Sequence, residues 1–180
     1  MKLLIASDIH GSAYYTERLM EAVKKENPDK VILLGDLLYH GPRNDLPKDY
    51  APKKVIEILN EIKDRLICVR GNCDTEVDQM VLSFPILSDY SSVFIDGYSI
   101  YLSQGHIYNK ENPLPLTEGD IFINGHTHIP VKEIKDGILY LNPGSISIPK
   151  ENSYHSYMVY ENGIFIWKNL SQEQYMEITI

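Results

Sequence analysis

The sequence predicts an α/β protein in which two β-sheets are layered and helices cover them from outside. Two patterns and the length of the chain support this prediction. Short apolar runs alternate with helical patterns in the first half, β-prone segments follow one another in the second half, and 180 residues is the size of one domain. We expect residues 1–180 to form that single domain, because no linker, sequence repeat or low-complexity tract divides them.

Three buried strands and two helices are expected before residue 70. Leu, Ile and Val dominate Lys2–Ser7, Lys30–Leu34 and Leu66–Val69, which is typical of strands covered on both faces. A helical pattern ended by Pro28 separates the first two runs, and one opened by Pro52 separates the last two. The apolar positions of these patterns are Tyr15, Leu19, Ala22 and Val23, then Val55, Ile58, Leu59 and Ile62. The β-α-β-α-β order predicts parallel strands with helices packed against them.

After about residue 90 the chain is a series of short β-prone segments, many of them separated by turn pairs such as Asp96-Gly97. No helical pattern of comparable length interrupts them, so we expect a largely antiparallel sheet. The segments are Ser92–Ile95, Ser99–Ser103, Asp120–Ile123, Pro130–Ile134, Ile138–Leu141, Tyr157–Tyr160 and Ile164–Trp167. Residues 39–51 and 107–119 are expected to be loops, and loops of about a dozen residues are more often functional than idle.

Charge and composition limit the possible functions. The chain has 17 Lys and Arg against 25 Asp and Glu, a formal net charge of −8. We expect no long nucleic acid as partner, because such binding needs a basic face. The apolar start is too short for a secretory signal, and no run approaches the roughly 18 apolar residues of a membrane span, so we expect a cytoplasmic protein without membrane contact. Two cysteines, Cys68 and Cys73, are too few for a disulfide scaffold.

One arrangement occurs five times along the chain: an apolar run ends and is followed within a few residues by side chains that can bind a metal ion. A small residue or a glycine stands between them and lets the backbone turn at the carboxyl end of the strand, where open α/β sheets place their ligands. In an extended segment, two ligands that are two residues apart face the same side. The candidate ligands are Asp8, His10, Asp36, Asn72, His106, His126 and His128.

Two carboxylates, one amide and four imidazoles are more ligands than one ion needs. The set suits two divalent ions that share a bridging carboxylate. A single Gly-Asp or Gly-His pair is common at strand ends without any ion, but four of the six histidines in one repeated context favour a metal site. No cysteine pair stands among these motifs, which argues against a structural zinc site. His40 and His155 have no partner at ligand spacing, and we do not expect them to bind metal.

These residues occur in the order of the calcineurin-like metallophosphoesterase superfamily, which the chain resembles over nearly its whole length. A closer resemblance is to the small bacterial YfcE-type phosphodiesterases, through residues 35–43, 70–80 and 142–150. The resemblance implies a four-layer α/β/β/α sandwich of two mixed β-sheets flanked by helices. The motifs that match the superfamily are Asp8-x-His10, Gly35-Asp36, Gly71-Asn72, Gly105-His106 and Gly125-His126-x-His128.

The family pattern implies a place for each ligand. The first ion would be held by Asp8, His10, Asp36 and His128. The second would share Asp36 and be completed by Asn72, His106 and His126. Members of the family often use manganese (Mn²⁺), and nitrogen and oxygen ligands also admit zinc, iron, cobalt or nickel. Two such ions about 4 Å apart can share a water, lower its pKa and orient the resulting hydroxide for in-line attack on phosphorus. We therefore expect a metal-dependent phosphodiesterase that hydrolyses small phosphodiesters.

Cys73 stands where the wider superfamily commonly has a histidine that assists the leaving group. It could be a weak proton donor, a thiol beside the second ion, or a loop residue without a role. Because a thiol is a weaker acid than imidazolium at neutral pH, we expect substrates whose leaving group needs little protonation. Cys68 lies inside an apolar run and is expected in the core.

Three further side chains are candidates for substrate contacts. Arg70 precedes the Gly71-Asn72 motif, and Arg43 lies in the loop that follows Asp36, so either guanidinium could reach a phosphate. The Asn72 amide could reach a phosphoryl oxygen besides holding the second ion.

The segment Asn142–Ser145 either supports the site or forms a plain type II turn.

Other functions remain open at this stage. A phosphomonoesterase, or a nuclease that acts on DNA ends, would use the same ions, although the short acidic chain without a DNA-binding extension disfavours the nuclease. A protein-binding scaffold of the same fold, such as the eukaryotic retromer subunit, should tolerate loss of the ligands, whereas all seven positions are filled here. The resemblance alone suggests a homodimer.

Overall fold

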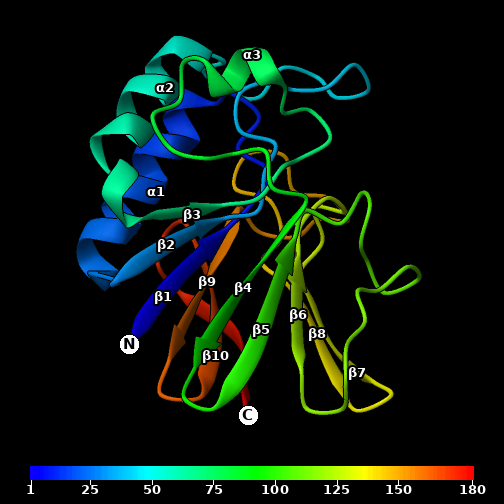
Figure 1. The fold of residues 1–180 in the computed structure, drawn as a ribbon. Helices are drawn as coiled ribbons and strands as arrows, with labels where there is room; N and C mark the ends of the chain where they lie inside the picture. Colours follow the sequence, from blue (N-terminus) through cyan, green and yellow to red (C-terminus); the bar gives the residue numbers. More distant parts are fainter.

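The computed structural model describes residues 1–180, which form eleven strands, three α-helices and one short 3₁₀ helix (Figure 1). The helices are α1 (Ala13–Glu26), α2 (Pro52–Glu61), α3 (Glu76–Gln79) and the 3₁₀ helix Lys63–Arg65. The strands are β1 (Lys2–Ala6), β2 (Lys30–Leu33), β3 (Leu66–Cys68), β4 (Tyr90–Ile95), β5 (Tyr98–Ser103), β6 (Ile121–Asn124), β7 (Val131–Lys135), β8 (Ile138–Asn142), β9 (Ser156–Glu161), β10 (Ile164–Asn169) and β11 (Gln174–Thr179).

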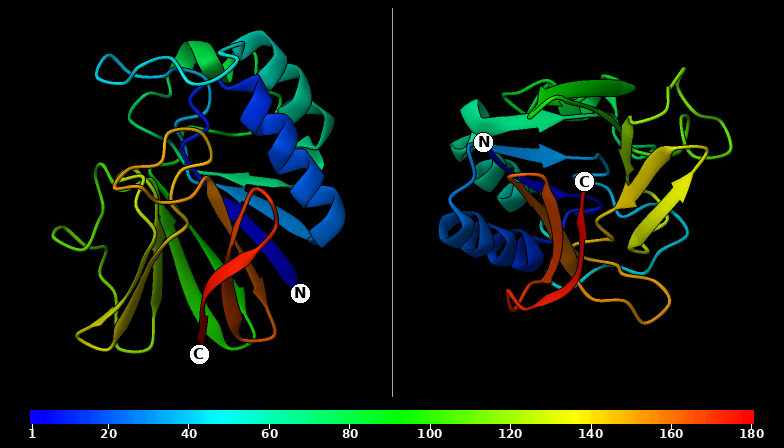
Figure 2. Two further views of the ribbon diagram at one scale, coloured as in Figure 1. Left: turned by 180° about the vertical axis from the view of Figure 1, so that it is seen from behind. Right: turned by 90° about the horizontal axis from the view of Figure 1, so that it is seen from below.

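The strands make two sheets that pack face to face. The six-stranded sheet has the order β11-β10-β9-β1-β2-β3, and the five-stranded sheet has the order β4-β5-β6-β8-β7. Each sheet contains both parallel and antiparallel neighbours. The predicted sandwich of two mixed sheets is therefore confirmed, and Figure 2 shows the two sheets from below with α1 and α2 outside the first of them.

Side chains alternate along β1 between two hydrophobic cores. Leu3 and Ile5 point into the core between the two sheets, and Leu4 and Ala6 point into the core beneath the helices. Helix α1 begins at Ser12, whose hydroxyl accepts a hydrogen bond from the amide of Tyr15. The β-α-β-α-β order predicted for the first part of the chain is confirmed, with β1, β2 and β3 parallel.

The second half of the chain departs from the largely antiparallel sheet that the sequence predicts. Strands β9, β10 and β11 cross back to the first sheet, where β9 pairs with β1. In the second sheet β5, β6 and β8 run parallel, although no helix connects them. The reason is that residues 107–119 make the crossover from β5 to β6 as an irregular loop, which carries no helical periodicity for sequence analysis to detect.

The same loop covers the outer face of the five-stranded sheet. Leu114 is buried there against Phe122 of β6 and Tyr140 of β8. Lys110 forms an ion pair of 2.9 Å with Glu133 of β7 and holds the loop against the sheet. In this chain the layer outside the second sheet is thus a loop, and the long helices lie on the first sheet only.

The carboxyl ends of five strands meet at one edge of the sandwich. β1, β2 and β3 end together because they are parallel, and the parallel strands β5 and β6 end opposite them in the second sheet. Each of these strands leads into one of the five ligand motifs predicted from the sequence. None of the helices has the length and apolar character needed to cross a lipid bilayer.

Candidate metal centre

Five of the seven candidate ligands lie in the left-handed region of backbone conformation. The φ angles are 58° for Asp8, 49° for His10, 55° for Asp36, 68° for His126 and 61° for His128. The expectation that the ligand pairs lie in extended segments is therefore wrong. The chain turns at every strand end, and residues other than glycine adopt this costly conformation mainly where the surrounding structure enforces it, as at functional sites.

Two of the motif glycines allow close approach to the ligands. A Cβ atom on Gly71 would lie 2.1 Å from Asp36 Oδ1, and one on Gly125 would lie 1.9 Å from Ser7 Oγ and 2.7 Å from Asp8 Oδ2. Real Cβ atoms essentially never approach so closely. Glycine at these two positions is thus needed to bring the loops after β3 and β6 against the two carboxylates.

The ligands of the proposed first ion converge in a buried cluster. His128 Nε2 lies 3.3 Å from Asp8 Oδ1 and 3.2 Å from His10 Nε2. His10 Nε2 lies 3.7 Å from both Asp8 Oδ1 and Asp36 Oδ2. All four side chains are at least nine-tenths buried, although they come from the loops that follow strands of both sheets. Four potential donor atoms therefore face one small space.

Backbone carbonyls orient two of the imidazoles in this cluster. His10 Nδ1 lies 2.8 Å from the carbonyl of Tyr39, and His128 Nδ1 lies 2.7 Å from the carbonyl of Ile148. A carbonyl accepts a proton but cannot give one, so each Nδ1 carries the hydrogen. In the neutral ring each Nε2 then presents a lone pair, which is the form of histidine that binds metal ions.

The pKa shifts of these groups indicate a site that favours a divalent cation. Burial and the neighbouring Asp8 carboxylate raise the pKa of Asp36 to about 7. Burial lowers the pKa of His10, which keeps its ring neutral. Burial also disfavours the charged form of His128, but the hydrogen bond to Asp8 and the Asp8 charge raise its pKa. Two close carboxylates thus favour a positive charge beside them, and a divalent ion that replaces the proton of His128 supplies that charge.

The ligands of the proposed second ion lie around the amide of Gln104, a residue that the sequence analysis missed. Gln104 is fully buried, and its Nε2 lies 3.5 Å from Asp8 Oδ1, 3.5 Å from Asp36 Oδ2 and 3.2 Å from His126 Nδ1. Its Oε1 accepts hydrogen bonds from the backbone amide of His106, at 3.2 Å, and from His106 Nδ1, at 2.8 Å. The signal in the sequence is a polar residue at a buried strand end, directly before Gly105-His106.

Burial lowers the pKa values of His106 and His126, so both rings are neutral and can bind metal. Their ring centres are 6.3 Å apart. Asn72 is exposed beside them, and its Nδ2 lies 3.2 Å from Cys73 Sγ. The ligands of the proposed second ion are thus farther apart and more exposed than those of the proposed first ion.

A layer of hydrogen bonds behind the ligands holds the loops in place. The buried carboxylate of Asp74 accepts hydrogen bonds from the backbone amides of Asp36, Leu37 and Gly71, at 2.8, 2.9 and 2.8 Å. This contact joins the loops after β2 and β3. The sequence analysis did not single out Asp74, which lies two residues after Asn72.

The segment Asn142–Ser145 supports the loops after β1 and β6. The amide of Asn142 donates to the carbonyl of Gly125 at 2.8 Å, and the hydroxyl of Ser145 donates to the carbonyl of Asp8 at 2.9 Å. Ser147 donates to the same Asp8 carbonyl at 3.0 Å. Of the two alternatives left open for this segment, the geometry favours the supporting role.

Cys73 lies at the centre, where its Sγ, a His10 nitrogen and an Asp36 oxygen are within 4.8 Å of one another. Its backbone amide donates to Asp36 Oδ1 at 2.8 Å. Burial and the Asp36 carboxylate raise the pKa of the thiol to about 12, so in the protein without ions it stays protonated. Cys68 is buried in the core, as expected.

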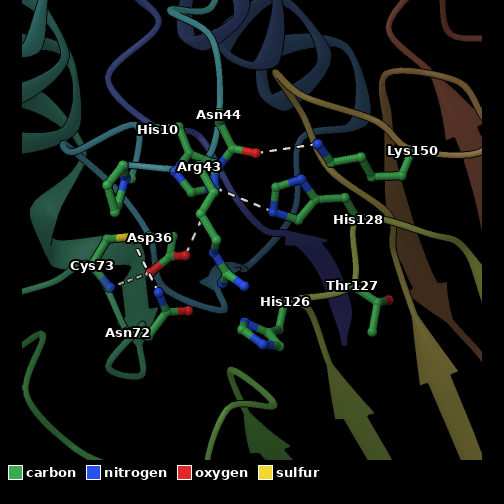
Figure 3. Close-up of a pocket in the computed structure, with 12 residues that line it drawn as sticks. His10, Asp36, Arg43, Asn44, Asn72, Cys73, His126, Thr127, His128 and Lys150 are labelled. Carbon is green, nitrogen blue, oxygen red and sulfur yellow. Dashed lines mark hydrogen bonds and ion pairs between the residues drawn. The ribbon is translucent and has the colours of Figure 1, made fainter.

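A polar cavity of about 400 Å³ opens above the ligands (Figure 3). It is lined by His10, Asp36, Gly41, Pro42, Arg43, Asn44, Asn72, Cys73, His126, Thr127, His128 and Lys150. Arg43 lies in the cavity wall, and its contact with a phosphate stays a prediction. Arg70 is outside this lining and forms a long ion pair of 3.8 Å with Glu76. Asn44, Thr127 and Lys150 are lining residues that the sequence analysis did not single out as site residues.

The model of the calcineurin-like phosphoesterase superfamily domain matches residues 1–162. The chain belongs to this superfamily. Among its relatives is phosphodiesterase YfcE of Escherichia coli K12, which is 47% identical over 164 residues, covering 91% of this chain and 89% of the relative. The matched residues include all seven candidate ligands of the candidate metal centre.

Two solved structures share the fold of this chain. The structure of YfcE, a phosphoesterase from E. coli, superposes with a TM-score of 0.97 at 44% identity and covers 100% of both chains. A structure of Vps29 from Entamoeba histolytica superposes with a TM-score of 0.67 at 20% identity, covering 100% of this chain and 99% of Vps29. At that identity the second match speaks for the shared fold alone.

Proposed function

We propose that the chain is a metal-dependent phosphodiesterase, a phosphoric diester hydrolase that acts on small phosphodiesters. The observation that carries the proposal is the convergence of Asp8, His10, Asp36 and His128 on one small space at the floor of the polar cavity. The 47% identity to a phosphodiesterase supports the choice of reaction.

Two divalent ions would be held at the centre. Asp8, His10, Asp36 and His128 provide the ligands of one ion, and Asp36 with Asn72, His106 and His126 provides those of the other. When bound, such ions supply positive charge for the phosphoryl oxygens and activate a water as the nucleophile. We propose manganese as the native metal, although the same ligands accept zinc, iron, cobalt or nickel.

The protein's own side chains position the substrate and the ligands. Arg43 extends over the cavity toward His126 and is placed to hold a phosphoryl oxygen (Figure 3). The Asn72 amide lies in the cavity wall and serves both an ion and the substrate. Gln104 and the carbonyls of Tyr39 and Ile148 fix the imidazole orientations and tautomers, which keeps the lone pairs aimed at the ions.

Cys73 and Arg70 each have one proposed role. Cys73 lines the cavity as a protonated thiol, and we propose it as a weak proton donor to the leaving group. Arg70 lies outside the cavity lining, so we propose that it contacts only those substrates that extend past His106. A homodimer and a cytoplasmic location remain predictions, and static light scattering of the purified protein checks the first of them.

The test compares bis(p-nitrophenyl) phosphate with p-nitrophenyl phosphate after metal removal and addition of each divalent ion in turn. We expect metal-dependent hydrolysis, highest with manganese, and a higher kcat/KM for the diester than for the monoester. A higher kcat/KM for the monoester under every metal would contradict the diesterase assignment. Absence of hydrolysis of either ester, with ions bound, would favour a scaffold of the same fold.

A further inference from the structure

Two cations without a neutralising partner face the same cavity. Arg43 lies in the loop between β2 and α2 and forms no ion pair and no side-chain hydrogen bond. Lys150 lies in the loop between β8 and β9, and its Nζ has one partner, the neutral amide oxygen of Asn44 at 3.2 Å. We call these two residues the cationic rim. Unpaired cations in a shared cavity are notable in a chain whose net charge is −8.

The backbone holds the cationic rim next to the candidate ligands. The backbone amide of Lys150 donates to the carbonyl of His128 at 3.2 Å, which fixes the start of its side chain beside the metal centre. Arg43 lines the same cavity as His126 and His128, and its side chain extends toward His126 (Figure 3). Both cations therefore act on the space that the substrate would occupy.

The charges of the proposed reaction balance without the cationic rim. Two divalent ions bring four positive charges, which Asp8 and Asp36, a hydroxide nucleophile and a singly charged diester together offset. Asp36 is the one carboxylate in the cavity lining. A simple diester would thus leave the exposed side chains of Arg43 and Lys150 without an anionic partner inside the site that they line.

The other walls of the cavity recognise polar groups rather than apolar ones. Beyond the ligands they offer the amide of Asn44 and the hydroxyl of Thr127, while Pro42 and Cys73 are the only lining side chains without strong hydrogen-bonding groups. No tyrosine, phenylalanine or tryptophan lines the cavity, and its aromatic rings are the imidazoles of the candidate ligands. The residues that line the cavity would therefore recognise a substrate through charge and hydrogen bonds.

We propose that the diester substrate carries a second anionic group, a carboxylate or a phosphate on one of its alcohol portions, which the cationic rim holds. This inference rests on the proposed function. A guanidinium and an ammonium are the groups that bind carboxylate and phosphate oxygens by charge-assisted hydrogen bonds. A phosphomonoester would not meet this need, because it carries both of its charges on the phosphoryl group bound at the ions.

The kinetic test uses three nitrophenyl phosphodiesters with the same leaving group. Their other alcohol is propyl, 2-carboxyethyl or 2-phosphonoethyl, so the first two differ by a methyl group against a carboxylate. We expect kcat/KM about 10-fold or more higher for both anionic esters than for the propyl ester, mainly through KM. Comparison of the 2-carboxyethyl ester with the 2-phosphonoethyl ester shows whether a carboxylate suffices or a phosphate-like group is preferred.

Substitutions then assign the preference to the cationic rim. Arg43→Gln and Lys150→Gln should each reduce the ratio between anionic and propyl esters, and the double variant should bring it near 1. Lys24→Gln, which removes an exposed charge from the far end of α1, is the matched control and should keep the wild-type ratio. A structural defect would slow all three esters equally and leave the ratio unchanged.

A binding measurement avoids turnover altogether. Calorimetry compares 3-phosphonopropionate with propylphosphonate on the metal-loaded protein, and we expect tighter binding of the former in the wild type and equal binding in the double variant. If the wild type hydrolyses the three esters equally well, or if both single variants keep the ratio, the inference is wrong and the proposed function stands. If no ester is hydrolysed, the proposed function fails and the inference fails with it.

Discussion

His10 Nε2 and His128 Nε2 face each other at 3.2 Å, and each ring donates its Nδ1 proton to a backbone carbonyl. When both rings are neutral, as metal binding requires, their two Nε2 lone pairs are directed at each other beside the Asp8 carboxylate. The arrangement is unfavourable by itself, and a cation between the nitrogens relieves it. The fold thus keeps the centre ready for an ion.

Metal removal should therefore lower the thermal stability of the protein. A ligand at 100 times its dissociation constant stabilises the folded state by about 2.7 kcal/mol, and each kcal/mol moves Tm by about 2–4 °C in a chain of this size. We expect Tm to fall by several degrees after chelation and dialysis, and to return when manganese is added. An unchanged Tm in calorimetric scans would show that ions contribute nothing to this centre.

Gln104 should control metal affinity although it lies behind the ligands. Replacing it by leucine, which has similar size, removes the acceptor that orients His106 and the donor that reaches His126. Losses of about 10–100-fold in metal affinity are typical for such supporting residues. Metal titration of Gln104→Leu checks this expectation, with the exposed Gln174→Leu as control. Equal affinity in both variants would mean that Gln104 only fills space.

Cys73 lines the cavity, and its backbone amide donates to Asp36, so Cys73→His should change substrate preference. A protonated imidazole near pKa 6.5 can donate a proton to a departing alkoxide, and such help is worth about 10²–10⁴-fold where the leaving group is poor. We expect faster hydrolysis of cyclic nucleotides and little change on nitrophenyl diesters, whose leaving group is already stable as an anion.

Cys73→Ala is the companion variant and should leave nitrophenyl diester hydrolysis largely intact. The measurement is the ratio of turnover on the two kinds of substrate for the wild type and both variants. If Cys73→Ala loses nitrophenyl activity as completely as a variant of a ligand, Cys73 is itself a ligand or an essential catalyst.

Glu26 should make stability depend on pH far from the metal centre. Burial by itself would raise its pKa, but hydrogen bonds and charges from Lys168, at 2.6 Å, and Lys2, at 3.0 Å, lower it below the usual 4.5. Because the folded-state pKa is the lower one, the stabilisation is complete above about pH 4.5 and is lost as pH falls through the folded pKa.

Tm curves of the wild type and Glu26→Gln should therefore lie apart at pH 6–7 and converge in acid. We expect a destabilisation of about 1–3 kcal/mol near neutral pH, the usual contribution of hydrogen bonds to a charged group. A Tm difference that stays constant down to pH 3 would show that the stabilisation by Glu26 does not come from its charge.

The sequence predicts the ligands better than it predicts the surroundings that hold them. The runs before Asp8 and Asp36 are apolar and end abruptly, so both the strands and the ligand positions can be found from local pattern. The left-handed backbone at these residues is different, because it depends on contacts with distant loops. Gln104 escaped notice for the same reason, since its four partners come together only in the folded chain.

Two elements of the fold lack a local signal altogether. Strand β11 (Gln174–Thr179) mixes Gln and Glu with apolar residues and pairs only with β10 at the sheet edge, so its pattern is weak. Helix α3 has four residues, too few for helical periodicity, although the capping pair Thr75 and Asp78 marks its start. The return of β9 to the first sheet is a matter of topology, which turn pairs along the chain do not encode.

The central claim is that two ions share Asp36, and Asp36→Asn tests it most directly. The substitution keeps an oxygen that can accept from the Cys73 amide, so the fold should survive, and circular dichroism checks that it does. Elemental analysis of the metal-loaded protein, with diester turnover on the same samples, is the decisive measurement. The account predicts two ions per chain in the wild type, fewer in Asp36→Asn, and loss of hydrolysis in the variant. Two retained ions with near-normal turnover in Asp36→Asn would contradict it.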